Sequence, residues 1–110
     1  GNPADGLFAA NAIRGSGGWV AGPSDDAIVA GIRLLAETTG VFAETAGGAV
    51  VGGALALAAS GRFRPDDEVV LCITGNGLKT LDALDLAPPQ VIEPKLSAFE
   101  AIFGGAYHVA

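Results

Sequence analysis

The sequence has 110 residues, of which half are hydrophobic and only 16% are charged, and its formal net charge is −6. This length suits one domain or part of one, and the hydrophobic content excludes an intrinsically disordered chain. The acidic balance argues against nucleic acid or an anionic membrane as a partner, because both require a basic surface. A single cysteine, Cys72, excludes an intrachain disulfide and a multi-cysteine zinc site. We predict no metal site and a reducing, cytoplasmic setting.

In the first forty residues, two helices are expected to flank a short strand. The first helix is predicted over Pro3–Ile13, with Asn2 as its cap and proline at the first helical position. Trp19–Ala21 reads as a strand, with the tryptophan as a core anchor. Ser24 should cap a second helix that ends at Gly40.

The remaining residues continue the alternation. Strands are predicted over Val41–Ala43 and Val69–Ile73, and helices over 45–60 and 96–103. The helix over 45–60 is apolar on every side, so we expect it to be buried. Its apolar run is shorter than the roughly 20 residues that cross a bilayer, which argues against a membrane span.

Helices that alternate with strands predict an α/β fold with parallel strands, here forming part of a larger three-layer parallel sheet. The carboxyl ends of parallel strands meet at one sheet edge, where ligands of open α/β sheets bind. Glu44 and Thr74 follow two of the predicted strands. We therefore expect the site at this edge.

Two polar segments at that edge could carry chemistry. The first begins at Glu44 and opens a helix with Gly47 and Gly48, where free N–H groups could hold an anion or simply form a helix cap. The second runs from Thr74 to Lys79 and is either a binding loop or a plain turn. Neither segment matches a phosphate-binding P-loop or a dinucleotide-binding glycine motif.

Taken together, three motifs resemble the C-terminal part of the threonine synthase family, whose fold also includes the tryptophan synthase β chain and cysteine synthase. The motifs are Gly1-Asn2-Pro3, Glu44-Thr45-Ala46-Gly47-Gly48 and Thr74-Gly75-Asn76-Gly77-Leu78-Lys79. The resemblance covers residues 1 to about 85 and implies that they are part of a catalytic domain that binds pyridoxal phosphate. Residues 86–110 are then a C-terminal extension with a short helix.

The resemblance also implies roles for individual residues. Thr74 matches the hydroxyl residue that hydrogen-bonds to the pyridine nitrogen of the cofactor, and Glu44 matches a carboxylate beside the ring. Gly75 and Asn76 would shape the loop under the ring. The resemblance assigns no catalytic residue here, because the family's cofactor-linked lysine and its phosphate-gripping glycine loop lie upstream. Lys79 does not match that lysine, and we expect it to form a surface or loop ion pair.

The family resemblance implies that the parent protein converts O-phosphohomoserine and water into threonine and phosphate. Its implied partners are a small phosphorylated amino-acid substrate and the remainder of the parent chain, and we expect a homo-oligomer. Three alternatives stay open: a serine/threonine dehydratase of the same fold, a non-catalytic module that binds an anion, and a structural fragment without activity.

Other reactive residue types have plainer interpretations. Cys72 lies in the predicted strand and is expected to behave as a small hydrophobe. The acidic run at Asp66-Asp67-Glu68 follows a proline and is interpreted as a solvated turn rather than a cation site. His108 is expected in a solvated tail.

Overall fold

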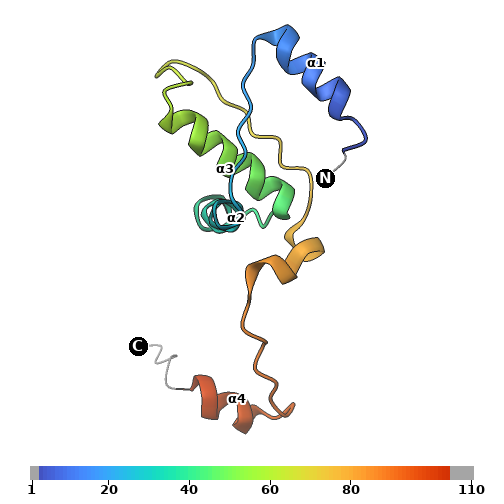
Figure 1. Ribbon diagram of the computed structural model, residues 1–110. Helices are drawn as coiled ribbons and strands as arrows, with labels where there is room; N and C mark the ends of the chain where they lie inside the picture. Colours follow the sequence, from blue (N-terminus) through green and yellow to red (C-terminus); the bar gives the residue numbers. More distant parts are fainter. Residues whose placement is uncertain (1–2, 105–110) are drawn as a thin grey trace.

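The computed structural model describes residues 3–104, and Figure 1 shows their arrangement. The elements are α1 (Gly6–Ser16), α2 (Asp25–Thr39), α3 (Thr45–Ala59), the 3-10 helix η1 (Gly77–Leu84) and α4 (Leu96–Phe103). Between residues 3 and 104 there is no β-strand, and the one isolated β-bridge pairs Ala43 with Asn76 in antiparallel orientation.

The predicted α/β fold with parallel strands is therefore wrong for this structure. The segments 19–21, 41–43 and 69–73 are not helical, as expected, but none of them forms a strand. A strand exists only where a neighbouring backbone completes its hydrogen-bond ladder. The apolar run at 69–73 meets no such neighbour among the described residues, and its Val70 side chain is 84% exposed. The hydrophobic pattern predicted an extended backbone for this segment but could not identify a second segment with which it would pair.

The two central helices, α2 and α3, form the packed part of the molecule. The Ser24 hydroxyl accepts a hydrogen bond from the backbone N–H of Ala27 at 3.3 Å, which confirms the predicted cap of α2. Gly40 ends this helix in the left-handed conformation, with φ of 75°, also as predicted. The buried hydrophobic residues come from α2, from α3 and the segment just before it, and from the end of η1: Ile32, Ala43, Val51 and Leu84.

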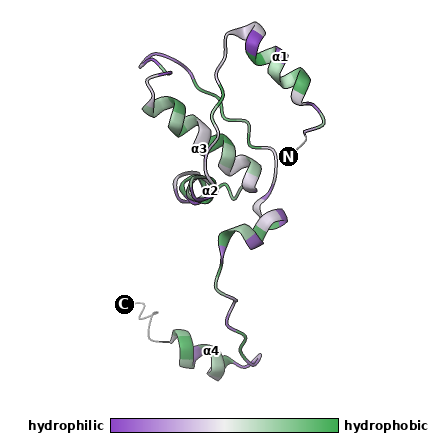
Figure 2. Ribbon diagram, viewed as in Figure 1, coloured by the Kyte–Doolittle hydropathy of each residue, from purple (hydrophilic) through white to green (hydrophobic). Residues whose placement is uncertain are grey.

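Helix α3 has the predicted bounds to within one residue, but only part of it is buried. Gly47, Gly48, Val51 and Gly52 face the interior in its first half. In its second half the Leu55 side chain is 52% exposed. Figure 2 shows the hydrophobic residues along α3 and along the extended segment that passes beside it. The expected burial of the whole helix is wrong, because too few elements cover its second half.

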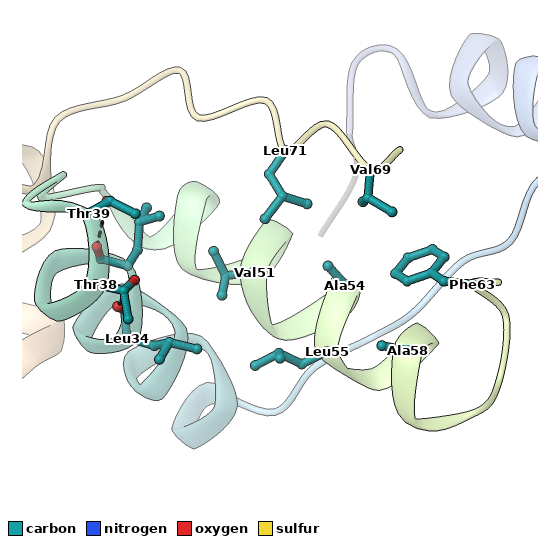
Figure 3. A pocket seen from close by; sticks show the side chains of 11 residues that line it. Leu34, Thr38, Thr39, Val51, Ala54, Leu55, Ala58, Phe63, Val69 and Leu71 are labelled. Atoms are coloured by element: carbon teal, nitrogen blue, oxygen red, sulfur yellow. Dashed lines mark hydrogen bonds between the residues drawn. The ribbon is translucent and has the colours of Figure 1, made fainter. Parts of the chain in front are cut away.

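A groove of about 380 Å³ follows from this incomplete cover and lies between α2, α3 and the segment 63–71 (Figure 3). Its two threonines, Thr38 and Thr39, donate their hydroxyl hydrogen bonds to carbonyl oxygens of their own helix. The other lining residues are apolar: Leu34, Leu35, Val51, Ala54, Leu55, Ala58, Phe63, Val69 and Leu71. The groove thus presents hydrophobic surface without a titratable or nucleophilic group.

The two ends of the described chain lie away from this packed pair of helices. Helix α1 begins and ends three residues later than predicted and has no buried residue. Its expected cap, Asn2, lies outside the described residues. Helix α4 has the predicted bounds and follows a long extended segment (Figure 1). The radius of gyration is 19.8 Å, whereas a compact chain of this length would have about 13 Å.

Trp19 does not act as the expected core anchor. Its side chain is 51% exposed, and the guanidinium carbon of Arg62 lies 5.3 Å from the centre of its ring.

Across residues 3–104, no helix is long and apolar enough to span a membrane.

Candidate functional site

The segments that precede α3 and η1 cross each other and define the candidate site. The N–H of Glu44 donates to the carbonyl oxygen of Gly75 at 3.0 Å, and the N–H of Gly77 donates to that of Phe42 at 3.0 Å. These two hydrogen bonds flank the Ala43–Asn76 bridge. The start of α3 and the 74–77 loop therefore lie together, although through an antiparallel crossing and not at the edge of a parallel sheet.

The Glu44 side chain lies at the centre of this crossing. Its side chain is only 14% exposed, and its Oε2 atom lies 2.7 Å from Nζ of Lys79. The same carboxylate rests against Gly75 so closely that a Cβ atom at position 75 would overlap it. Glycine at 75 thus makes room for the carboxylate. The expected loop ion pair of Lys79 is confirmed, and its partner is Glu44.

The start of α3 is capped by a residue that the sequence interpretation did not include. The Oγ1 atom of Thr80 accepts a hydrogen bond from the N–H of Thr45 at 3.1 Å, while the Glu44 side chain makes no capping hydrogen bond. The N–H of Thr45, at the start of α3, is therefore already bound by a side chain of the protein itself. This leaves one fewer donor for an anion at this helix start and weakens the interpretation as an anion-binding module.

The remaining two predicted site residues lie on the 74–77 loop. Asn76 caps η1, because its Oδ1 atom accepts a hydrogen bond from the N–H of Leu78 at 2.9 Å. Thr74 is exposed, and its hydroxyl has no hydrogen-bond partner within the described part of the chain. Its donor and acceptor capacity is therefore available to a ligand, while the Asn76 oxygen is engaged in holding the loop.

Two further features of the site were not predicted from the sequence: the contact between Phe42 and Gly77, and the helix η1. Gly77 packs under the ring of Phe42, where a Cβ atom would lie 2.6 Å from the ring carbons. The helix η1 was also missed, although Leu78, Leu81 and Leu84 recur at the three-residue spacing of a 3-10 helix.

The other reactive residues considered in the sequence analysis lie outside this crossing. Cys72 is exposed and not buried in a strand as expected. The Asp67 carboxylate accepts hydrogen bonds from the Arg64 backbone and guanidinium at 2.9 and 3.1 Å, which fits the interpretation of this segment as a turn. No group of three or more metal-ligating side chains occurs within residues 3–104, and His108 lies outside these residues.

Comparison with known proteins identifies the class. Residues 1–75 match the family of pyridoxal-phosphate dependent enzymes, so the chain belongs to this family. Proteins of this class bind pyridoxal phosphate as their cofactor.

Several relatives carry a more particular name. The chain is 35% identical to the threonine synthase of Halalkalibacterium halodurans over 96% of its own length and 31% of the relative. It is 42% identical to the threonine synthase of a Bacillus species over 74% of the chain and 23% of that relative. A third threonine synthase, from Methanosarcina acetivorans, is 37% identical over 96% of the chain and 27% of the relative. The chain therefore spans less than a third of the length of these relatives.

The residues at the crossing fit a pyridine ring in their chemistry. A ring nitrogen needs a single hydrogen-bond partner, and the exposed Thr74 hydroxyl can provide one. The space beside Gly75 is occupied by the Glu44 carboxylate, so the Thr74 hydroxyl is the group at this loop that is open to a ring nitrogen. The chemistry of this one hydroxyl is compatible with a ring nitrogen as its partner.

Proposed function

We propose that this chain is part of a threonine synthase, which converts O-phosphohomoserine and water into threonine and phosphate. The observation that carries this proposal is the match of threonine synthases from separate bacterial and archaeal organisms to most of the chain. The motif Thr74-Gly75-Asn76-Gly77-Leu78-Lys79 supports it, because this is the loop through which the resemblance to threonine synthases is most specific.

Within this function, the chain contributes binding and orientation of the cofactor. When bound, pyridoxal phosphate supplies the electron-withdrawing ring on which the bond changes of the substrate depend. The hydroxyl of Thr74 would hydrogen-bond to the pyridine nitrogen, and Glu44 would lie beside the ring. Gly75 and Asn76 would shape the loop beneath it.

A neutral hydroxyl at this nitrogen has an electrostatic consequence. It provides no counter-charge that would keep the nitrogen protonated, whereas a carboxylate would. The ring then withdraws electrons less strongly, and specificity for one reaction among several depends on the surrounding protein groups. The Glu44 carboxylate rests against Gly75 of this loop, and its charge is paired with Lys79.

The proposal extends to the organisation and setting of the protein. Residues 1–85 would belong to the cofactor-binding catalytic domain, and residues 86–110 would form a C-terminal extension that carries α4. The substrate would be a small phosphorylated amino acid, and the partners of the chain would be the remainder of its parent protein and further copies of that protein. We place the protein in the cytoplasm.

The direct test is an assay of the purified full-length protein with O-phosphohomoserine. We expect release of inorganic phosphate and formation of threonine in equal amounts, dependent on added pyridoxal phosphate. A dehydratase of the same family would instead release ammonia from threonine or serine and would leave O-phosphohomoserine unchanged. Cofactor binding without either reaction would overturn the assignment to threonine synthase while leaving the family membership intact.

A further inference from the structure

We propose that Lys79 is a positioning residue, which acts through its ion pair with Glu44 to hold the 74–77 loop against the start of α3. The inference rests on the proposed function in so far as Thr74, on this loop, contacts the cofactor. The ion pair itself is a property of the structure.

The contacts form a chain from Lys79 to the loop. Nζ of Lys79 lies 2.7 Å from Oε2 of Glu44, and the other oxygen of that carboxylate, Oε1, rests against Gly75. The backbone of Glu44 is tied to the same glycine, because its N–H donates to the Gly75 carbonyl oxygen at 3.0 Å. Lys79 therefore fixes the side chain that covers the residue next to Thr74.

The two partners differ in exposure, and the position of the less exposed Glu44 side chain depends on its pairing with Lys79. The Glu44 side chain is 14% exposed, whereas the Lys79 side chain is 64% exposed. A carboxylate with little access to water is unfavourable without a partner, so loss of the lysine would drive Glu44 outward. Gly75 would then lose the side chain that packs on it, and the loop would gain freedom.

The pairing also sets the charge beside the loop. With Lys79 present, Glu44 and Lys79 together are neutral, and Thr74 presents a neutral hydroxyl. Without the lysine, the Glu44 carboxylate would lose both its compensating charge and its fixed position, so the electrostatic environment of the loop would change. A lysine that acts only as surface charge would have no effect on the absorption spectrum of the bound cofactor.

The test uses the full-length protein with the variants Lys79→Met, Lys79→Arg, Glu44→Gln and the double variant Lys79→Met/Glu44→Gln. The readouts are the dissociation constant and absorption spectrum of bound pyridoxal phosphate, and hydrogen exchange of the amides of residues 75–78. We expect Lys79→Met to raise the dissociation constant about two- to fivefold, the range of a partly exposed ion pair. It should also change the absorption spectrum and speed up amide exchange. Lys79→Arg keeps the positive charge, so its dissociation constant, spectrum and exchange rates should resemble those of the wild-type protein.

The double variant decides whether Lys79 acts through Glu44. We expect Lys79→Met to have no further effect in the Glu44→Gln background, since the carboxylate that it positions is already gone. The matched control is Lys95→Met, which removes another exposed lysine. Nζ of Lys95 lies 2.6 Å from Oε2 of Glu93, and this ion pair lies outside the candidate site. This control should leave every readout unchanged.

Two results separate this inference from the proposed function. If the wild-type protein binds the cofactor and makes threonine but Lys79→Met changes none of the readouts, or adds its full effect to Glu44→Gln, the positioning role is overturned alone. If the wild-type protein lacks threonine synthase activity, the proposed function fails. In that case faster exchange of the loop amides in Lys79→Met still supports the positioning role, and unchanged exchange overturns it.

Discussion

Gly31 of α2 faces Gly48 of α3 so closely that a Cβ atom at position 31 would lie 2.6 Å from the carbonyl oxygen of Gly48. A Cβ atom at Gly48 would in turn collide with the carbonyl oxygen of Ile28. The two helices meet backbone to backbone at this point, so side chains cannot be added without moving the helices apart. The contact positions α3, and with it Glu44 at the start of that helix.

The first prediction follows from this contact. Gly31→Ala should destabilise the protein by about 1–3 kcal/mol, the cost of overpacking a closely packed contact. Thermal denaturation of the purified full-length protein measures the effect. Gly53→Ala is the matched control, because the nearest atom to its new Cβ is that of Ala21 at 3.7 Å. This control should stabilise α3 by up to about 1 kcal/mol through helix propensity. Equal effects of the two substitutions would contradict the close contact.

The second prediction concerns Thr74 in the full-length protein. Thr74→Ala should weaken cofactor binding by about 0.5–1.5 kcal/mol, the net contribution of one hydrogen bond. Thr74→Ser retains the hydroxyl and should bind the cofactor normally. Thr74→Asp should favour a protonated ring and change which side reactions compete. Titration with pyridoxal phosphate, absorption spectra and product analysis measure these effects. If no variant changes affinity, spectrum or turnover, Thr74 is only a loop residue.

The third prediction concerns Gly75, where any side chain would displace the Glu44 carboxylate. Gly75→Ala should break the Glu44–Lys79 ion pair and weaken cofactor binding at least as much as Lys79→Met. The comparison variant is Gly22→Ala, since no atom lies within 4 Å of the Cβ that it adds. Isothermal titration with the cofactor should show a normal dissociation constant for Gly22→Ala. Normal binding by Gly75→Ala as well would show that the carboxylate moves aside without consequence.

The fourth prediction concerns the 110-residue chain expressed by itself. Val70 is 84% exposed and Leu55 is 52% exposed, and the groove between α2 and α3 is lined mostly by apolar side chains. Exposed apolar surface of this kind promotes association. We expect sedimentation velocity to show self-association of the chain, reduced by Val70→Lys. A monodisperse monomer with cooperative unfolding would contradict this expectation.

The sequence predicted α2, α3 and α4 well because the signals that bound these helices are local. Ser24 and Gly40 bound α2 through contacts within a few residues, and the bounds of α4 also agree with the prediction. The predicted strand at Val69–Ile73 failed because pairing depends on residues far away in the chain, which no local pattern identifies. The apolar composition of that segment indicates a preference for burial and does not specify a pairing partner.

In the candidate site, too, local features could be predicted from the sequence, whereas contacts between distant segments could not. The polar residues that precede α3 and η1, Glu44 and Asn76, could be selected from the sequence. That Glu44 would pair with Lys79 could not, because their contact depends on an antiparallel crossing of two segments that the predicted parallel sheet did not include. The cofactor roles of Thr74, Glu44, Gly75 and Asn76 remain predictions.

The contact between Trp19 and Arg62 gives this chain an internal optical probe. Trp19 is the single tryptophan of the sequence, and the Arg62 guanidinium lies over its ring. Indole emission depends on neighbouring charge and on access to water, so separation of these two groups should change its intensity and wavelength. Fluorescence of the isolated chain therefore reports whether the segment before α2 stays beside the turn after α3, independently of any enzymatic assay.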